Sequence, residues 1–128
     1  MTRPEGPTLA ITFFYYRDLA AACRFYEDTL CLDLAIDQGW AKIYRICADA
    51  HVGLVDETQG FHRAAPNKPV QLCLRVADLD GWYAWIRTQK ANGLSEVFEN
   101  EAIGIRAFVF NDPEGYQIEV QTPLRAGA

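Results

Sequence analysis

The sequence predicts an α+β protein built from two tandem β-α-β-β-β modules. Two similar segments carry this prediction, since Tyr16-Arg17-Asp18-Leu19 and Val76-Ala77-Asp78-Leu79 each end an apolar, strand-like run and open an amphipathic helix. After each helix come three further strand-like runs, so the second half of the chain repeats the order of the first. With 128 residues, of which 50% are hydrophobic and 12% aromatic, the chain is long and apolar enough to bury a core.

In the first module, the apolar and aromatic run Leu9–Tyr16 predicts a buried strand. Asp18 is expected to cap the helix that follows, because its carboxylate can accept a hydrogen bond from an unpaired N–H of the first turn. Apolar residues at helical spacing continue to Leu30 and place Phe25 in the core. Three more strands are expected, at Leu32–Asp37, Trp40–Cys47 and His51–Val55.

The second module begins with a strand at Val70–Val76 and a helix capped by Asp78, which we expect to close at Asn92-Gly93. On this helix, Trp82 and Trp85 are predicted to share a core face, and Tyr83 to face solvent or a dimer partner. Three strands complete the module, at Glu96–Asn100, Ile105–Phe110 and Tyr116–Gln121.

These elements predict a single domain over residues 1–128. Module one covers about 8–56 and module two about 70–121, with a polar linker or lid at 57–69 and a frayed tail at 122–128.

Composition and charge exclude several classes of function. The net charge is −5 and no two Lys or Arg residues are adjacent, which argues against nucleic acid or an anionic membrane as partner. The chain has no apolar stretch of transmembrane length and its first residues are polar and rich in Pro and Gly, so we expect a soluble, cytoplasmic protein. The four cysteines show no paired metal-binding spacing and are expected to be reduced and mostly buried: Cys23, Cys31, Cys47 and Cys73.

The alternation of residues along the strands predicts what each sheet presents on the side away from its helix. In the second module this face is polar and carries Gln71, Cys73, Arg75, Gln117, Glu119 and Gln121. In the first module it is mostly apolar and carries Ile11, Phe13, Tyr15, His51, Gly53 and Val55. The polar face either lines a pocket or is the solvated side of an antiparallel sheet.

Several motifs resemble the vicinal oxygen chelate superfamily, which includes glyoxalase I, bleomycin-resistance proteins, extradiol dioxygenases and fosfomycin-resistance enzymes. The resemblance rests on the opening Phe-Tyr-Tyr-Arg-Asp-Leu, on Arg24-Phe25-Tyr26-Glu27-Asp28-Thr29-Leu30, and on Asp112-Pro113-Glu114-Gly115-Tyr116-Gln117-Ile118-Glu119. It implies that the paired modules form a cupped, mixed eight-stranded sheet, usually in a homodimer. One departure is Cys31, where the family usually has Gly, so a positive φ there would be strained.

The resemblance also implies where a divalent metal would bind. The family's four ligand positions map to Ile11, Gly53, Gln71 and Glu119, of which Ile11 and Gly53 have no lone pair to donate. We therefore expect no metal. The alternative is a divalent ion such as Ni, Zn, Mn or Fe held by Glu119, Gln71 and His51.

Without a metal, the cup is still predicted to be a ligand pocket with apolar walls and a few polar groups. Its expected ligand-binding residues are Phe13, Tyr15, Trp40 and Tyr44 from the first module, and Gln71, Arg75, Gln117 and Glu119 from the second. Aromatic planes beside a carboxylate suit a planar or cationic ligand. Alternatively, Trp40 and Tyr44 point into the core, and Arg75 and Glu119 pair with each other.

The sequence thus favours a metal-independent protein that binds a small aromatic or cationic molecule, similar to bleomycin-resistance proteins. Whether it is an enzyme is left open. One alternative is a metal-dependent, glyoxalase-like lyase or isomerase, or a dioxygenase. Another is metal-free catalysis with Glu119 as the base, its pKa raised by apolar walls.

Overall fold

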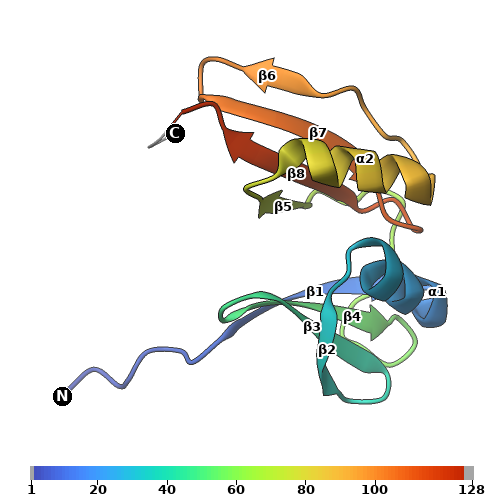
Figure 1. The fold of residues 1–128 in the computed structure, drawn as a ribbon. Helices are drawn as coiled ribbons and strands as arrows, with labels where there is room; N and C mark the ends of the chain where they lie inside the picture. Colours follow the sequence, from blue (N-terminus) through green and yellow to red (C-terminus); the bar gives the residue numbers. More distant parts are fainter. Residues whose placement is uncertain (1, 126–128) are drawn as a thin grey trace. The chain divides into compact units, whose positions relative to one another are not determined.

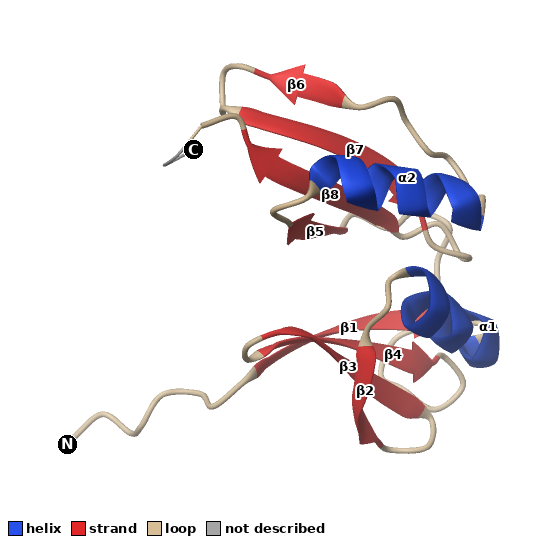
Figure 2. Ribbon diagram, in the orientation of Figure 1, coloured by secondary structure: helices blue, strands red, loops and turns tan. Residues whose placement is uncertain are grey.

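The computed structural model describes residues 2–125 and shows two compact units, which meet in the chain between Ala65 and Pro66 (Figure 1). Each unit is a four-stranded mixed sheet with one helical segment, as Figure 2 shows. The α+β class and the tandem β-α-β-β-β order predicted from the sequence are therefore confirmed. The single-domain organisation over 1–128 stays a prediction.

The first unit contains β1 (Ala10–Tyr16), α1 (Leu19–Arg24), which continues as the π-helical turn η1 (Phe25–Thr29), β2 (Asp33–Asp37), β3 (Ala41–Cys47) and β4 (Ala50–Asp56). The strands are ordered β1-β4-β3-β2. The pair β1 and β4 is parallel, because the helix carries the chain across the sheet, and the other two pairs are antiparallel hairpins.

The second unit repeats this plan with β5 (Gln71–Arg75), α2 (Leu79–Gln89), β6 (Phe98–Asn100), β7 (Ile105–Asn111) and β8 (Gln117–Pro123). Its strand order is β5-β8-β7-β6, with β5 and β8 parallel. The final strand extends through Pro123, so the predicted frayed tail is wrong for Thr122 and Pro123, which pair with β7. The last part of that predicted tail, 126–128, lies outside the described residues.

Both helices begin where the Asp-Leu pairs predict. The Asp18 carboxylate accepts a hydrogen bond from the Ala21 N–H at 3.1 Å, and Asp78 accepts one from the Gly81 N–H at 2.9 Å. The predicted end of α2 at Asn92-Gly93 is wrong, because Lys90 already adopts the left-handed conformation, with φ of 55°. Asn92 instead forms a bridge with Asn111.

The first helical segment ends at Thr29 with Leu30 as its cap, and the next residue, Cys31, has a φ of 59°, the strained, left-handed conformation anticipated from the missing glycine. We expect Cys31→Gly to raise the free energy of unfolding by about 1 kcal/mol, because glycine removes the Cβ clash at a modest entropic cost. Urea denaturation measures this change. Cys31→Ala is the matched control, since it removes the thiol but keeps the Cβ, and an equal gain there would assign the effect to the thiol.

The core of the first unit is aromatic. Phe14 and Tyr16 point from β1 toward the helix, and the Tyr16 hydroxyl donates a hydrogen bond to the Tyr26 hydroxyl at 3.1 Å. Tyr44 is also fully buried and donates a hydrogen bond to the Glu27 carboxylate. Burial, together with hydrogen bonds involving Cys23 and Glu27, raises the pKa of Tyr44 well above its ordinary value.

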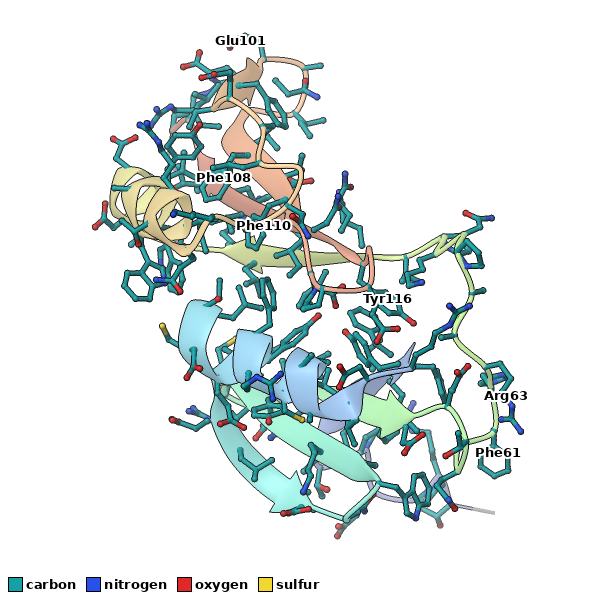
Figure 3. The ribbon with its side chains drawn as sticks, turned by 90° about the vertical axis from the view of Figure 1, so that its right-hand side faces the viewer. Phe61, Arg63, Glu101, Phe108, Phe110 and Tyr116 are labelled. Carbon is teal, nitrogen blue, oxygen red and sulfur yellow. The ribbon has the colours of Figure 1, made fainter. Side chains whose placement is uncertain are left out.

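The core of the second unit forms where α2 packs on β7 and β8. Phe108 and Phe110, labelled in Figure 3, are fully buried, and the Tyr83 ring lies 5.0 Å from that of Phe108. The Tyr83 hydroxyl donates to the Ser95 carbonyl at 2.9 Å. The predictions for Tyr83 and Trp85 are therefore wrong, since Tyr83 faces the core whereas Trp85 is 39% exposed, and Trp82 is partly buried.

The Asp-Pro-Glu-Gly turn that leads into β8 is built around a buried carboxylate. Asp112 is 1% exposed, and its Oδ1 accepts hydrogen bonds from the backbone N–H groups of Glu114 and Tyr116 at 2.9 and 3.0 Å. Gly115 supplies the positive φ of 90° that the turn requires. These features explain why this motif is informative in the sequence.

None of the four cysteines, all within the described residues, is in a disulfide. The expectation that they are mostly buried is wrong, because Cys31, Cys47 and Cys73 are exposed and Cys23 is partly exposed. Over residues 2–125, the helices are all too short or too polar to cross a lipid bilayer.

Candidate ligand-binding cavity

The first unit presents an apolar face on the side of its sheet that α1 leaves open. Strand alternation places Ile11, Phe13 and Tyr15 opposite the buried Phe14 and Tyr16. In the parallel register, Phe13 lies beside Gly53 of β4, and Tyr15 lies beside Val55. The faces predicted for β1 and β4 therefore agree with this structure.

A cavity of about 340 Å³ lies at one end of this face. It is lined by residues from β1, β3 and β4, from the turn between β2 and β3, and from the loop after β4: Phe13, Tyr15, Trp40, Ala41, Val55, Gln59, Gly60 and Phe61. None of these described lining residues carries a charged side chain. The cavity thus offers aromatic surface, with Gln59 as its one amide side chain.

The loop after β4 packs directly against the cavity wall. A Cβ atom on Gly60 would come within 2.6 Å of Val55 Cγ1 and 2.7 Å of Tyr15 Cε2, so only glycine allows this approach. Asp56 starts the loop, and its Oδ1 accepts hydrogen bonds from the Thr58 N–H and hydroxyl, which lower the pKa of the Asp56 carboxyl. The sequence predicts a linker or lid at this loop, but Phe61 is not among the predicted ligand-binding residues.

The four predicted aromatic residues do not all reach the cavity. Phe13, Tyr15 and Trp40 line it, with Phe13 41% and Trp40 46% exposed. The prediction for Tyr44 is wrong, because its ring is buried on the helix side of the sheet. In the register, Tyr44 pairs with Val52, which is also buried and alternates with Gly53 of the open face.

The open face of the second unit is polar, as predicted, and its side chains bond to one another. Gln71 Nε2 donates to Gln117 Oε1 at 2.6 Å, which joins β5 to β8. Arg75 donates to Gln121 Oε1 at 2.6 and 3.0 Å, and Gln121 Nε2 donates to Glu119 Oε2 at 2.8 Å. The hydrogen bonds thus link Arg75 to Glu119 through Gln121, a residue that was not among the predicted ligand-binding set.

Cys73 lies beside Glu119 in the register of β5 and β8. Although Cys73 is exposed, neighbouring protein atoms partly desolvate its thiol and raise its pKa, and the negative charge of Glu119 raises it further. A thiol with a raised pKa is protonated at neutral pH, so this cysteine is not set up as a nucleophile.

Comparison with known proteins gives the family. A model for the glyoxalase/bleomycin resistance protein/dioxygenase superfamily matches residues 8–120. The chain belongs to this superfamily. None of the curated proteins compared with it is significantly similar in sequence.

Several solved structures share the fold at low sequence identity. A lactoylglutathione lyase from Agrobacterium tumefaciens is 21% identical, with a TM-score of 0.73, and the match covers 98% of this chain and 100% of the other. A glyoxalase/bleomycin resistance protein/dioxygenase from Nocardioides is 18% identical, with a TM-score of 0.76, over 98% and 89% of the two chains. TioX from Micromonospora sp. ML1 is 15% identical, with a TM-score of 0.73, over 93% and 100%. Identities this low establish the fold and leave the function to the site.

The metal-ligand positions that the resemblance implies for the first unit do not fit a metal ion. Ile11 and Gly53 offer no donor atom, and the Phe13 ring lies over Gly53, where a Cβ would come within 2.5 Å of Phe13 Cε1. A ligating side chain at position 53 would therefore have to displace this ring. Among residues 2–125, neither unit by itself groups three His, Cys, Asp or Glu side chains as a metal site requires.

His51, the predicted substitute ligand, is 9% exposed, and its Nδ1 lies 3.1 Å from the Asp49 carbonyl. That contact fixes the ring at the start of β4. In the register, His51 pairs with Ile11 and Arg45, neither of which is a metal ligand type.

Proposed function

We propose that this protein is a metal-independent small-molecule binding protein whose cavity holds a planar, uncharged aromatic compound without transforming it. The observation that carries this proposal is the Phe13 ring lying over Gly53. The ring occupies the space that a metal-ligating side chain at position 53 would need. Phe13 and Gly53 therefore form an apolar floor at a position where the resemblance implies a metal ligand.

The lining of the cavity supports a flat aromatic ligand. Phe13, Trp40 and Phe61 are partly or fully exposed, so their ring faces carry apolar surface that a ligand can cover. Offset or edge-to-face contacts between rings contribute about 0.5–1.5 kcal/mol each beyond the burial of area. A volume of about 340 Å³ is at the small end of ordinary ligand sites and suits two or three fused rings.

The absence of charged side chains in the described cavity lining favours an uncharged ligand over the cationic one that the sequence also allowed. A buried cation needs a carboxylate or another anion near it, because desolvating a charge is costly. The described residues that line the cavity include no Asp or Glu. An uncharged ring system fits this lining better than a cationic one.

Titration with acridine at mildly alkaline pH, where this ring system is uncharged, tests the proposal through Trp40 fluorescence. We expect saturable quenching that Trp40→Phe removes, although Trp82 and Trp85 still emit. Phe13→Ala should weaken binding by about tenfold, as expected for the loss of roughly 1.4 kcal/mol of ring contact and floor. Quenching that persists unchanged in both variants would place the acridine outside this cavity.

The polar face of the second unit has a separate proposed role in hydrogen bonding to a ligand, through Gln71, Arg75, Gln117 and Glu119. We expect Glu119→Gln to change the free energy of unfolding by less than about 1 kcal/mol, because an amide oxygen can still accept the Gln121 hydrogen bond. Chemical denaturation measures this change. A loss above about 2 kcal/mol would make Glu119 a structural hydrogen-bonding centre and remove it from the proposed site.

We also propose that the protein is a homodimer, as the superfamily resemblance implies, and that it is cytoplasmic, as the polarity of its sequence predicts. Light scattering coupled to size-exclusion chromatography measures the mass directly. A monomer mass across the accessible concentrations would contradict the dimer.

A further inference from the structure

The loop that presents Phe61 is held closed by one arginine. Arg63 Nη1 donates hydrogen bonds to the Glu57, Gly60 and His62 carbonyls at 2.7, 3.1 and 3.3 Å. Gly60 and His62 are the two neighbours of Phe61 in the chain. The guanidinium group therefore fixes the backbone on both sides of this residue.

Two further contacts close the same loop. Glu57 Oε1 accepts a hydrogen bond from the Ala64 N–H at 3.0 Å, which ties the start of the loop to its end. The His62 ring packs edge-on against Tyr15, with 5.2 Å between the centroids, and so joins the loop to the cavity wall. Figure 3 shows Phe61 and Arg63 together on this loop.

The Phe61 side chain is not stabilised by burial of its own ring in this structure. It lines the cavity, yet 98% of its surface is exposed, which is unfavourable for an aromatic side chain in water. Its position is therefore set by the hydrogen bonds of the surrounding backbone and not by packing of its own ring. A wall fixed in advance lowers the entropic cost of binding, because less of the loop has to be ordered when the ligand arrives.

We propose that Arg63 is a positioning residue for the ligand: by holding the loop at residues 57–62, it keeps Phe61 as the outer wall of the aromatic cavity and slows ligand release. This inference rests on the proposed function, since it concerns the same cavity. It deepens that function by naming Phe61 as the ring that covers the outer side of a flat ligand, and Arg63 as the group that sets its residence time. Loss of the guanidinium group loosens the loop that carries Phe61 and leaves Phe13, which forms the floor of the cavity, in place.

The test uses the full chain and acridine as the probe, with affinity measured by calorimetry and release measured by stopped-flow fluorescence. Arg63→Ala and Phe61→Ala are each expected to weaken binding by about tenfold, mainly through faster dissociation. Arg63→Lys should recover part of the loss, because an ammonium group donates hydrogen bonds but lacks the rigid fork. The matched control is Arg45→Ala, which also removes an arginine bond to a backbone carbonyl, from Arg45 Nε to Ala48 O at 3.0 Å, at a residue that does not line the cavity.

The double variant Phe61→Ala with Arg63→Ala decides whether Arg63 acts through Phe61. We expect it to bind acridine as the Phe61→Ala single variant does, because the wall that Arg63 holds is already gone. Wild-type affinity in Arg63→Ala, or a further tenfold loss in the double variant, would overturn the positioning role while the proposed function stands. Failure of the unmodified chain to bind acridine would overturn the proposed function and this role with it.

Hydrogen exchange without ligand gives a readout that a general loss of stability would not produce. The Gly60 and Ala64 amides should exchange faster in Arg63→Ala than in Arg45→Ala, while the amides of β1 and β4 exchange alike in the two variants. Equal exchange of the loop amides in both variants would contradict the claim that Arg63 holds this loop.

Discussion

Replacing Gly53 by leucine is expected to abolish acridine binding and to lower the free energy of unfolding by about 1–3 kcal/mol. The Phe13 ring occupies the space that a side chain at position 53 would need, and Ile11 Cγ2 lies 3.2 Å from the Cβ position. An added side chain therefore overpacks the floor and pushes Phe13 into the cavity. Chemical denaturation and acridine calorimetry measure the two effects.

Combining Gly53→Leu with Phe13→Ala tests whether the loss of stability comes from the steric conflict between these two side chains. In a Phe13→Ala background, the leucine at position 53 should cost less, because the ring that it displaces is absent. The coupling between the two positions is expected to be about 1 kcal/mol or more. Additive effects would mean that Phe13 does not cover Gly53 in solution, and the argument against a metal ligand at this position would lose its basis.

The second large effect concerns the helix of the first unit. Tyr26→Ala is expected to lower the free energy of unfolding by about 3–5 kcal/mol, because Tyr26 is fully buried and lies against the rings of Tyr16 and Tyr44. Phe25→Ala should cost clearly less, since Phe25 is partly exposed, and it is the matched control one residue away. Thermal and urea denaturation of the two variants provide the comparison, and a larger loss for Phe25 would reverse the assignment of the core face.

The sequence predicts Phe25 in the core because helical spacing puts it, together with Tyr26, on the apolar side of this segment. In the structure Ala22, Tyr26, Thr29 and Leu30 are buried, whereas Phe25 is partly exposed. Tyr26 is therefore the core aromatic residue of this segment.

The repeat of the modules was predictable because it depends on local features. Asp18 and Asp78 cap helices through hydrogen bonds to residues three positions away, so their spacing to the apolar runs is enough to identify them. The strain at Cys31 was predicted from the family resemblance, which implies glycine at this position, and the φ of 59° agrees with it.

The composition of the cavity was only partly predictable. Phe13 and Tyr15 followed from strand alternation, but Tyr44 did not, because the face of β3 is set by its pairing with β4, which places Tyr44 beside the buried Val52. Phe61 could not have been found from periodicity, since it lies in a loop. Its place in the cavity depends on hydrogen bonds from Arg63, and a sequence pattern carries no signal for these.

Because the solved structures named above are no more than 21% identical to this chain, the residues of the site say more about its function than the fold does. The superfamily's description covers enzymes and resistance proteins, and the same modules serve all of them. In this chain, two metal-ligand positions are Ile11 and Gly53, and an aromatic ring covers the second. The uncharged lining of the cavity is consistent with the proposed binding of a flat, neutral molecule.

One calorimetric comparison tests the central claim most directly. Chelator-treated protein is titrated with acridine and with 9-aminoacridine, which carries a positive charge on the same ring system, and the acridine titration is repeated after adding nickel or zinc. We expect acridine to bind one per chain, at least tenfold more tightly than the cation, and with an affinity that neither metal changes. Binding that requires added metal, or a preference for the cation, would contradict the account.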